Sequence, residues 1–297
     1  MSAKKKKNRK ATTSRGSNRT AIAVAHHDEG STATFPTELK SDGHQCPLLL
    51  NKDNEIAASL QQAKKLYRGV KVIAAYRLLR CIDMRNDSTA EKLGREHREI
   101  YNRGKMCEES VQDLLNPPNS RPEDGWIKQG ESCGSFPTEI YYKVDSKVRL
   151  TCRVETPIEQ ALLVPLLSVL NESELYKDWF PSSTSPRMGL LQSKALARYG
   201  RADQVLQVTT SAPWPFSNRE VVLETVVFDD IDQNGLFGVL LGTAATGGVV
   251  PPPDAGVKRV GFEGMLLFRP CPHNHPVLAN NNPEPHTESK ILVTFKM

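Results

Sequence analysis

The stretch APWPFSNREVVLE, residues 212–224, places two prolines and two aromatic residues directly before a strand-like run. Pro213 and Pro215 fix their own φ angles and favour extended conformations in the residues that precede them. The stretch is therefore a stiff connection into a strand that we expect to begin near Glu220. Taken alone, it predicts that Trp214 and Phe216 cap one end of a sheet core.

On both sides of this connection, apolar residues recur with the period of β-strands. In EIYYKVDSKVRLTCRVE, residues 139–155, apolar and polar positions alternate, as a sheet with one solvated face requires. The same segment predicts a hairpin that turns near Asp145 and Ser146. Short loops join most of the other strands, so we expect an antiparallel sheet. These strands are expected at residues 190–199, 204–210, 220–228, 236–243, 257–269 and 290–296.

Two segments before the sheet have the period of α-helices. Apolar residues recur every three or four positions from Ile56 to Ala74 and again from Leu93 to Leu114, which indicates an antiparallel helical hairpin. Residues 88–91, Ser-Thr-Ala-Glu, form a capping box that predicts the start of the second helix. Further along, Pro157 opens and Pro165 interrupts a leucine-rich segment, which predicts one bent helix and a short second one.

The net charge of +5 comes from the first 20 residues, which hold eight Lys or Arg and no acid. Without these eight, the 39 basic residues of the chain fall to 31, against 34 acidic ones. Any attraction to an anionic membrane surface therefore belongs to this tail. No aromatic residue interleaves its charges, so we expect no nucleic-acid partner. The candidate membrane-surface residues are Lys4, Lys5, Lys6, Lys7, Arg9 and Lys10.

Residues 1–52 are polar and without apolar periodicity, which predicts a disordered tail. No run reaches the ~18 apolar residues that a membrane span needs, and no apolar segment of a signal peptide follows the basic start. We therefore expect a cytoplasmic or nuclear protein that contacts membranes only at their surface. The six cysteines are scattered and lack a Cys-x-x-Cys pair, so reduced thiols are expected rather than a disulfide framework or a zinc ribbon.

The motifs that resemble metal sites have simpler explanations. DIDQNG, residues 230–235, begins like a calcium loop, but Leu241 stands where the loop needs a bidentate Glu, and its Asn-Gly pair predicts a tight hairpin turn. CPHNHP offers Cys271, His273 and His275, yet no partner pair has zinc spacing, so we expect a solvated loop. No nucleophile elbow, P-loop or HExxH helix is present. We expect no metal, no cofactor and no enzymatic activity.

Three motifs in this order resemble the StAR-related lipid transfer family, the START domains: ELYKDWFP (174–181), APWPFSNRE (212–220) and a strand that ends in FDDID. Trp126 and the IYYKV strand are similar to the start of the family, so the resemblance covers about residues 126–297. Glu220 departs from the family, where Asp is more usual. Beside Trp179 the chain has Tyr176 and Phe180, where phosphatidylcholine-carrying members have an Arg and an Asp that meet the head group.

The resemblance implies an α+β helix-grip fold, in which a curved antiparallel sheet surrounds a hydrophobic tunnel that holds one lipid or sterol. Its implied activity is non-enzymatic binding, with intermembrane transfer or sensing of the ligand. START domains end in a long amphipathic helix over the tunnel, whereas this chain ends inside the expected last strand, so we expect a C-terminally incomplete domain. The candidate lipid contacts are Tyr142, Trp214, Phe216 and Arg219.

The expected organisation is a basic tail at residues 1–52, a helical hairpin at 53–116 and a START-like domain at 124–297. Two other functions stay open. An interaction protein would bind a protein partner through the hairpin, with the START-like part as ligand sensor, and would leave an apolar face on the hairpin. A helix-grip enzyme would need an acid and base pair with perturbed pKa values in the tunnel.

Overall fold

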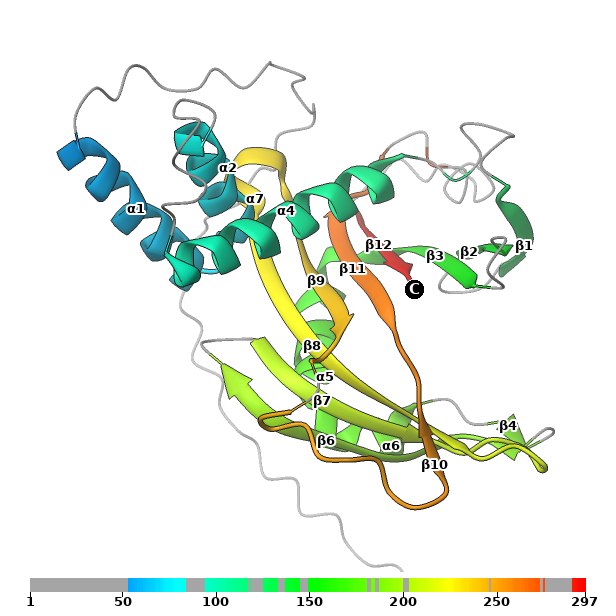
Figure 1. Cartoon of the computed structure of the whole chain (residues 1–297). Coiled ribbons are helices and arrows are strands. Elements are labelled where there is room, and N and C mark those ends of the chain that lie inside the picture. Colours follow the sequence, from blue (N-terminus) through cyan, green and yellow to red (C-terminus); the bar gives the residue numbers. More distant parts are fainter. Residues whose placement is uncertain are drawn as a thin grey trace, which may run out of the picture. The chain divides into compact units, whose positions relative to one another are not determined.

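The fold is described from a computed structural model of the chain (Figure 1). It describes residues 53–83, 94–116, 118, 125–132, 137–144, 149–180, 183–184, 187–199, 203–245, 247–272, 275 and 290–297. The basic tail with Lys4 to Lys10, the capping box at 88–91, the turn at Asp145 and Ser146, and His273 lie outside the described residues. None of the described helices is long and apolar enough to cross a membrane.

Most described strands form one ten-stranded sheet whose edge strands, β1 and β6, do not pair with each other, so the sheet is open. All neighbours are antiparallel except β10, which runs parallel to the start of β8. This confirms the predicted α+β class and antiparallel sheet. The strands in spatial order are β1 (Ile127–Ser132), β2 (Thr138–Val144), β3 (Leu150–Glu159), β12 (Lys290–Lys296), β11 (Glu263–Pro270), β9 (Leu236–Thr243), β8 (Asn218–Asp230), β7 (Asp203–Thr210) and β6 (Leu190–Tyr199).

Two short elements differ from the predicted strands. The segment predicted as one strand at 257–269 is broken into β10 (Val257–Arg259) and β11, because β10 pairs with β8 beyond the end of β9. The predicted tight turn at Asn234 is instead one helical turn, α7 (Ile231–Asn234), which ends at Gly235 with φ 65°. A separate ribbon pairs β4 (Ser183–Thr184) with β5 (Arg187–Met188).

One face of the sheet, called here the helix side, is covered by α2 (Val72–Asp83) and α4 (Arg95–Leu115), and α1 (Asp53–Arg68) packs against these two helices. Figure 1 shows α4 crossing the sheet strands. Successive strand residues point to opposite faces. On the helix side, Phe228 and Leu267 are fully buried and share a core with Cys107 and Leu114 of α4. The predicted second helix is thus confirmed, and its buried residues are Ile100, Gly104, Cys107, Val111 and Leu114.

The prediction of one continuous helix from Ile56 to Ala74 is wrong, because this segment breaks at Gly69 and Val70 into α1 and α2. Val70 has φ 68°, the left-handed region that β-branched residues avoid. Its carbonyl oxygen accepts the backbone N–H of Asp229 at 2.9 Å, and Lys71 Nζ lies 3.3 Å from Asp229 Oδ2. The break therefore joins the helices to β8, a contact about 160 residues away that local periodicity does not contain.

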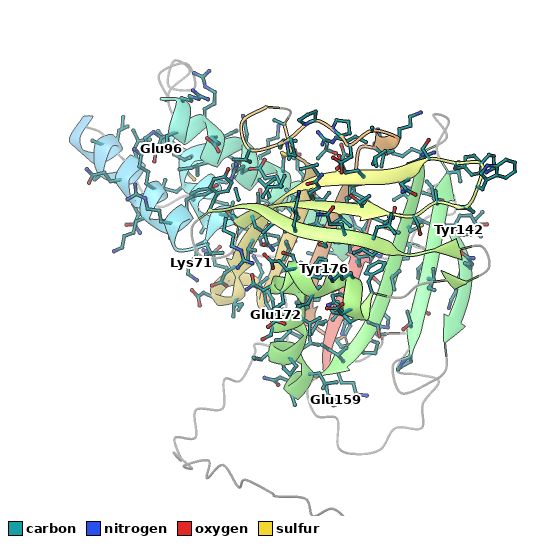
Figure 2. All side chains as sticks on the ribbon, turned by 90° about the horizontal axis from the view of Figure 1, so that it is seen from below. Lys71, Glu96, Tyr142, Glu159, Glu172 and Tyr176 are labelled. Atoms are coloured by element: carbon teal, nitrogen blue, oxygen red, sulfur yellow. The ribbon has the colours of Figure 1, made fainter. Side chains whose placement is uncertain are left out.

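The opposite face, called here the α5 side, carries the helices between β3 and β6. They are η2 (Gln160–Leu162), α5 (Leu163–Asn171), η3 (Ser173–Leu175) and α6 (Tyr176–Trp179). Glu172 and Tyr176 mark this segment between strands β6–β8 and β1–β3 in Figure 2. Pro165 lies in the first turn of α5, where a missing backbone N–H costs no helical hydrogen bond, whereas Pro157 belongs to β3. Leu163, Leu166, Leu167 and Leu170 pack on Phe268 and Ile291 of the sheet.

The cysteines depart from the expectation of reduced thiols at one position. Cys81 is disulfide-bonded. Cys107, Cys152 and Cys271 are free, and burial raises the pKa of the Cys107 thiol to about 12, so it is not a reactive thiolate.

Candidate functional site

The α5 side carries an apolar helix that the fold does not bury. Every residue of α5 except Ser168 and Asn171 is apolar, yet none of its residues is buried. The leucine face rests on the sheet, while Val164 on another face of the helix is 71% exposed. A helix that is hydrophobic on all sides is normally buried. The surface around α5 therefore has the character of a binding surface for an apolar ligand.

A second group of exposed apolar side chains lies at one end of the sheet. The β7–β8 loop exposes 92% of Trp214 and 63% of Phe216, so neither caps the sheet core as the isolated motif predicts. The pairing of β8 through β9, β11, β12 and β3 to β2 places Val144 and Leu150 at this same end, and both are exposed. Large exposed apolar side chains thus lie at this end of the sheet on the β7–β8 loop and also on β2 and β3.

The candidate contacts Tyr142 and Arg219 lie on strands that are not neighbours. Tyr142 alternates with Tyr141, whose hydroxyl is on the helix side and donates to Glu139 at 2.8 Å, so Tyr142 faces the α5 side. Arg219 is on β8, five strands away along the sheet. Its Nη1 donates to the carbonyl of Ser217 at 2.6 Å and so holds the β7–β8 loop. The two residues are therefore far apart in the strand order of the sheet.

Glu220, the residue after Arg219, is structural. It is buried on the helix side, accepts from Gln207, and lies 2.6 Å from Arg259 Nη2. Arg259 also donates to the carbonyl of Pro251 at 2.6 Å. The carboxylate therefore fixes β10 and the loop before it to β8. Arg259 is 39 residues from Glu220, and no local pattern in the sequence identifies it as the partner.

Only one group of described residues has ligand atoms spaced to hold a metal ion, namely Glu139, Glu155 and His275, which are all buried. Their carboxylates already have cationic partners. Lys128 Nζ is 2.7 Å from Glu139, and Arg153 Nε is 3.0 Å from Glu155. A divalent cation would add two charges beside a guanidinium that stays protonated. The arrangement fits an ion network that joins β1, β2 and β3.

His275 belongs to this network rather than to the solvated loop predicted for CPHNHP. Its Nε2 lies 3.2 Å from Glu155 Oε2. Burial raises the pKa of the Glu155 carboxyl, but the hydrogen bond to His275 and the charge of Arg153 outweigh burial and bring the pKa to about 2. The carboxylate is therefore charged throughout the physiological pH range, as a structural ion pair requires.

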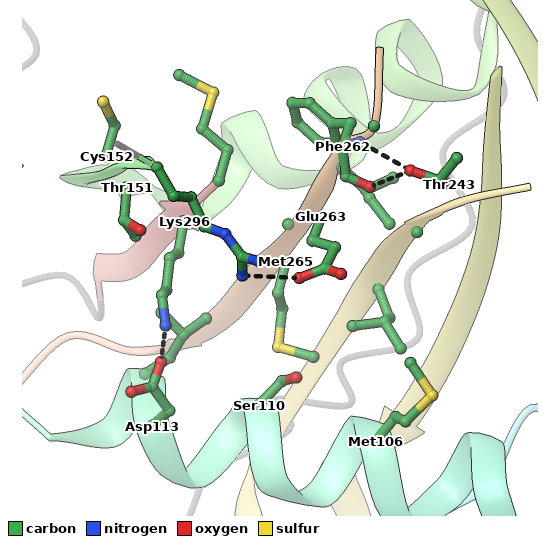
Figure 3. Close-up of a pocket in the computed structure, with 18 of the residues that line it drawn as sticks. Met106, Ser110, Asp113, Thr151, Cys152, Thr243, Phe262, Glu263, Met265 and Lys296 are labelled. Atoms are coloured by element: carbon green, nitrogen blue, oxygen red, sulfur yellow. Dashed lines mark hydrogen bonds and ion pairs between the residues drawn. The ribbon is translucent and has the colours of Figure 1, made fainter. Parts of the chain in front are cut away.

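A cavity of about 770 Å³ lies beside α4, where it meets the ends of β3, β9 and β11 (Figure 3). Leu114, Leu240 and Met265 line it with apolar surface. Its polar rim consists of ion pairs, Lys296 with Asp113 and Arg149 with Glu263 at 3.8 Å. The lining residues of α4 place this cavity on the helix side, so it is distinct from the surface around α5.

Comparison with known proteins gives matches at the level of structure. No protein-family model and no curated protein matches the chain. Among solved structures, a STAR-related lipid transfer protein fragment from Xanthomonas axonopodis is 19% identical, with a TM-score of 0.41, over 58% of this chain and 80% of its own. These structural neighbours are START-related proteins.

Two human structures give similar values. Human STARD10 is 14% identical with a TM-score of 0.41, over 60% of this chain and 62% of its own. The lipid transfer and protein localization domain of human StarD13 is 16% identical with a TM-score of 0.40, over 63% and 79%. The likeness to these structures is limited to structure, at identities of 14–19%.

Proposed function

We propose that the α5 side of the sheet binds one lipid or sterol molecule, and that the protein carries or senses this ligand without catalysing a reaction. The observation that supports the proposal is the unburied apolar helix α5, with Val164 71% exposed. Each methylene group taken out of water contributes ~0.8 kcal/mol, so an acyl chain or sterol body covering this helix would stabilise both partners. Tyr142 faces the same side and is a candidate contact.

The exposed aromatic loop supports a surface role in the same function. Trp and Phe side chains favour the interface between water and membrane, and Trp214 and Phe216 project from a loop at one end of the sheet. We propose that this loop touches the membrane when the ligand is exchanged, with Arg219 holding the loop in place. The tail residues Lys4 to Lys10 would add up to about 1 kcal/mol each near an anionic leaflet.

The two alternative functions have less support. Among the described residues of α1, α2 and α4, Met106 is the only large apolar side chain that is mostly exposed, so these residues form no extended exposed apolar face for a protein partner. Three carboxyls with a shifted pKa, the buried Glu155 and Asp230 and the half-buried Asp203, lie on the helix side and not beside α5. A binding function is therefore the better proposal for the α5 side.

The experiment is native mass spectrometry of the full chain, purified from cells and after incubation with liposomes of mixed phospholipid and sterol. A lipid-sized adduct is expected, and Val164→Glu should remove it because the charge would lie on the exposed face of α5. Met106→Glu is the matched control, since Met106 is similarly exposed but lies on α4. Adducts of equal intensity in both variants, or none in the folded parent chain, would refute the proposal.

A further inference from the structure

A second cavity, of about 600 Å³, lies on the helix side between α1, α4, β7 and the loop after β9. Nearly half of its lining residues are valine or alanine, including Val72, Val205 and Val250. Its polar groups come from elements that are distant in sequence and include Tyr67 of α1, Arg103 of α4 and Asp203 of β7. Small-molecule sites commonly have this size and this combination of apolar walls with a few convergent polar groups.

The guanidinium of Arg103 already has three partners. Its Nη1 donates to the Tyr67 hydroxyl at 2.9 Å, and its Nη2 lies 3.0 Å from Glu99 and pairs with Glu224. Two carboxylates thus neutralise one guanidinium. An anionic ligand would have to displace Glu99 or Glu224 to reach this guanidinium.

Asp203 differs from Arg103 in its hydrogen-bond partners. Its Oδ1 accepts the backbone N–H of Val227 at 2.9 Å, and no side chain in the described part of the chain donates a hydrogen bond to it. Burial raises the pKa of this carboxyl, although the Val227 N–H and the charge of Arg103 partly oppose the shift. In the whole lining, negative charges outnumber positive ones. There are three carboxyl groups, on Glu99, Asp203 and Glu224, and two guanidinium groups, on Arg68 and Arg103.

We propose that this cavity binds a small organic ammonium ion, whose charged nitrogen pairs with the Asp203 carboxylate and whose apolar body lies against the valine wall. A hydrogen bond between an ammonium and a carboxylate is among the stronger polar contacts, and it is strengthened where water is excluded. The cavity lies on the helix side, so this ligand is separate from the lipid proposed for α5. A result that refutes one of the two proposed sites does not refute the other.

The test is isothermal titration calorimetry of the full chain with cyclohexylammonium, and with cyclohexanecarboxylate as a probe of nearly the same apolar body and opposite charge. We expect the cation to bind and the anion not to bind. Asp203→Asn should weaken binding of the cation at least about tenfold, because it removes the charge and keeps the shape. The matched control is Glu263→Gln, a carboxylate that is 82% exposed and outside this cavity, and it should bind like the parent chain.

A second variant keeps the test decisive if Asp203→Asn does not fold. Ala245 is exposed and lines the cavity, so Ala245→Trp should fill its mouth and abolish cation binding without touching the carboxylate. The proposal fails if the folded parent chain does not bind the cation, if the anion binds equally well, or if both variants bind like the parent. Lipid adducts in mass spectrometry should be unchanged in both variants.

Discussion

Arg153 on strand β3 donates from Nη2 to the carbonyl oxygen of Leu114 at 2.8 Å, so a sheet residue caps the C-terminal end of α4. Its Nη1 does the same for the carbonyl of Asn116 at 2.7 Å, and its Nε binds Glu155 at 3.0 Å. The last carbonyls of a helix have no partner within the helix and carry a partial negative charge. One buried guanidinium thus satisfies two of them together with a carboxylate.

Replacing this guanidinium should be costly. We expect Arg153→Met to lower the free energy of unfolding by about 3–5 kcal/mol, because it leaves the buried Glu155 carboxylate without its cation. Urea denaturation measures the change. The control is Arg149→Met, whose side chain is 64% exposed and 3.8 Å from Glu263, and it should stay within about 0.5 kcal/mol of the parent. Similar losses in the two variants would contradict the role given to Arg153.

The same network should make stability depend on pH. The pKa of Glu155 is lowered from 4.5 to about 2, so its contribution is complete above pH 4.5 and disappears as the pH falls toward 2. We expect Glu155→Gln to be less stable than the parent at pH 7, and the difference, up to about 3 kcal/mol, to shrink below pH 4.5. Urea midpoints at a series of pH values measure this. A difference that stays constant down to pH 3 would show that the shifted carboxyl is not the cause.

Gly104 should tolerate no side chain. A Cβ at this position would lie 2.3 Å from Tyr76 Cβ and 2.8 Å from the Val72 carbonyl oxygen, where α4 meets α2. Gly104→Ala should therefore lower the free energy of unfolding by about 1–3 kcal/mol, although alanine is the better helix former. At Gly130 a Cβ would meet nothing within 4 Å, so Gly130→Ala is the control. A rise in the melting temperature of Gly104→Ala would contradict the packing of α2 on α4.

At Val70, by contrast, the backbone conformation favours glycine over the residue present. Its left-handed conformation costs roughly 1–2 kcal/mol for a residue with a Cβ, whereas glycine adopts it freely. We expect Val70→Gly to be as stable as the parent or up to about 1 kcal/mol more stable, after the entropy cost of glycine is subtracted. Gly235→Ala, at φ 65°, should lose about 1 kcal/mol. Thermal unfolding of the two variants checks the signs, and a clear loss in Val70→Gly would be the contrary result.

The β7–β8 loop should matter for membranes and not for folding. Because Trp214 and Phe216 are largely exposed, the double variant Trp214→Ala, Phe216→Ala should unfold like the parent. Each large side chain inserted at an interface contributes about 1.5–3 kcal/mol, so binding to liposomes should weaken by tenfold or more. Co-sedimentation with vesicles measures it, with Met106→Ala as control. Unchanged binding by the double variant would remove the loop from the proposed function.

The parts of the fold that the sequence predicts are those fixed by neighbours along the chain. The period of three and four residues from Leu93 to Leu114 identifies the buried face of α4, because a helix brings those positions together whatever the rest of the chain does. Strand alternation likewise separates Tyr141 from Tyr142. The break at Val70 is set instead by its hydrogen bond to Asp229, which no window of local sequence contains.

The candidate site is less predictable for the same reason. The aromatic loop is visible in APWPFSNRE, but whether Trp214 is buried or exposed depends on what packs against it. The cavity with Tyr67, Arg103 and Asp203 joins residues from two helices and a strand, and only the tertiary arrangement brings them together. The same holds for His275 and Glu155, which are 120 residues apart.

The two outermost strands of the sheet, β1 and β6, never meet. A closed barrel changes its girth only by breaking a row of backbone hydrogen bonds or adding a strand. An open sheet can bend more or less tightly while every ladder between neighbouring strands stays intact. The breadth of the ligand proposed for its α5 side would therefore be governed by the stiffness of the sheet, and not by a fixed circumference.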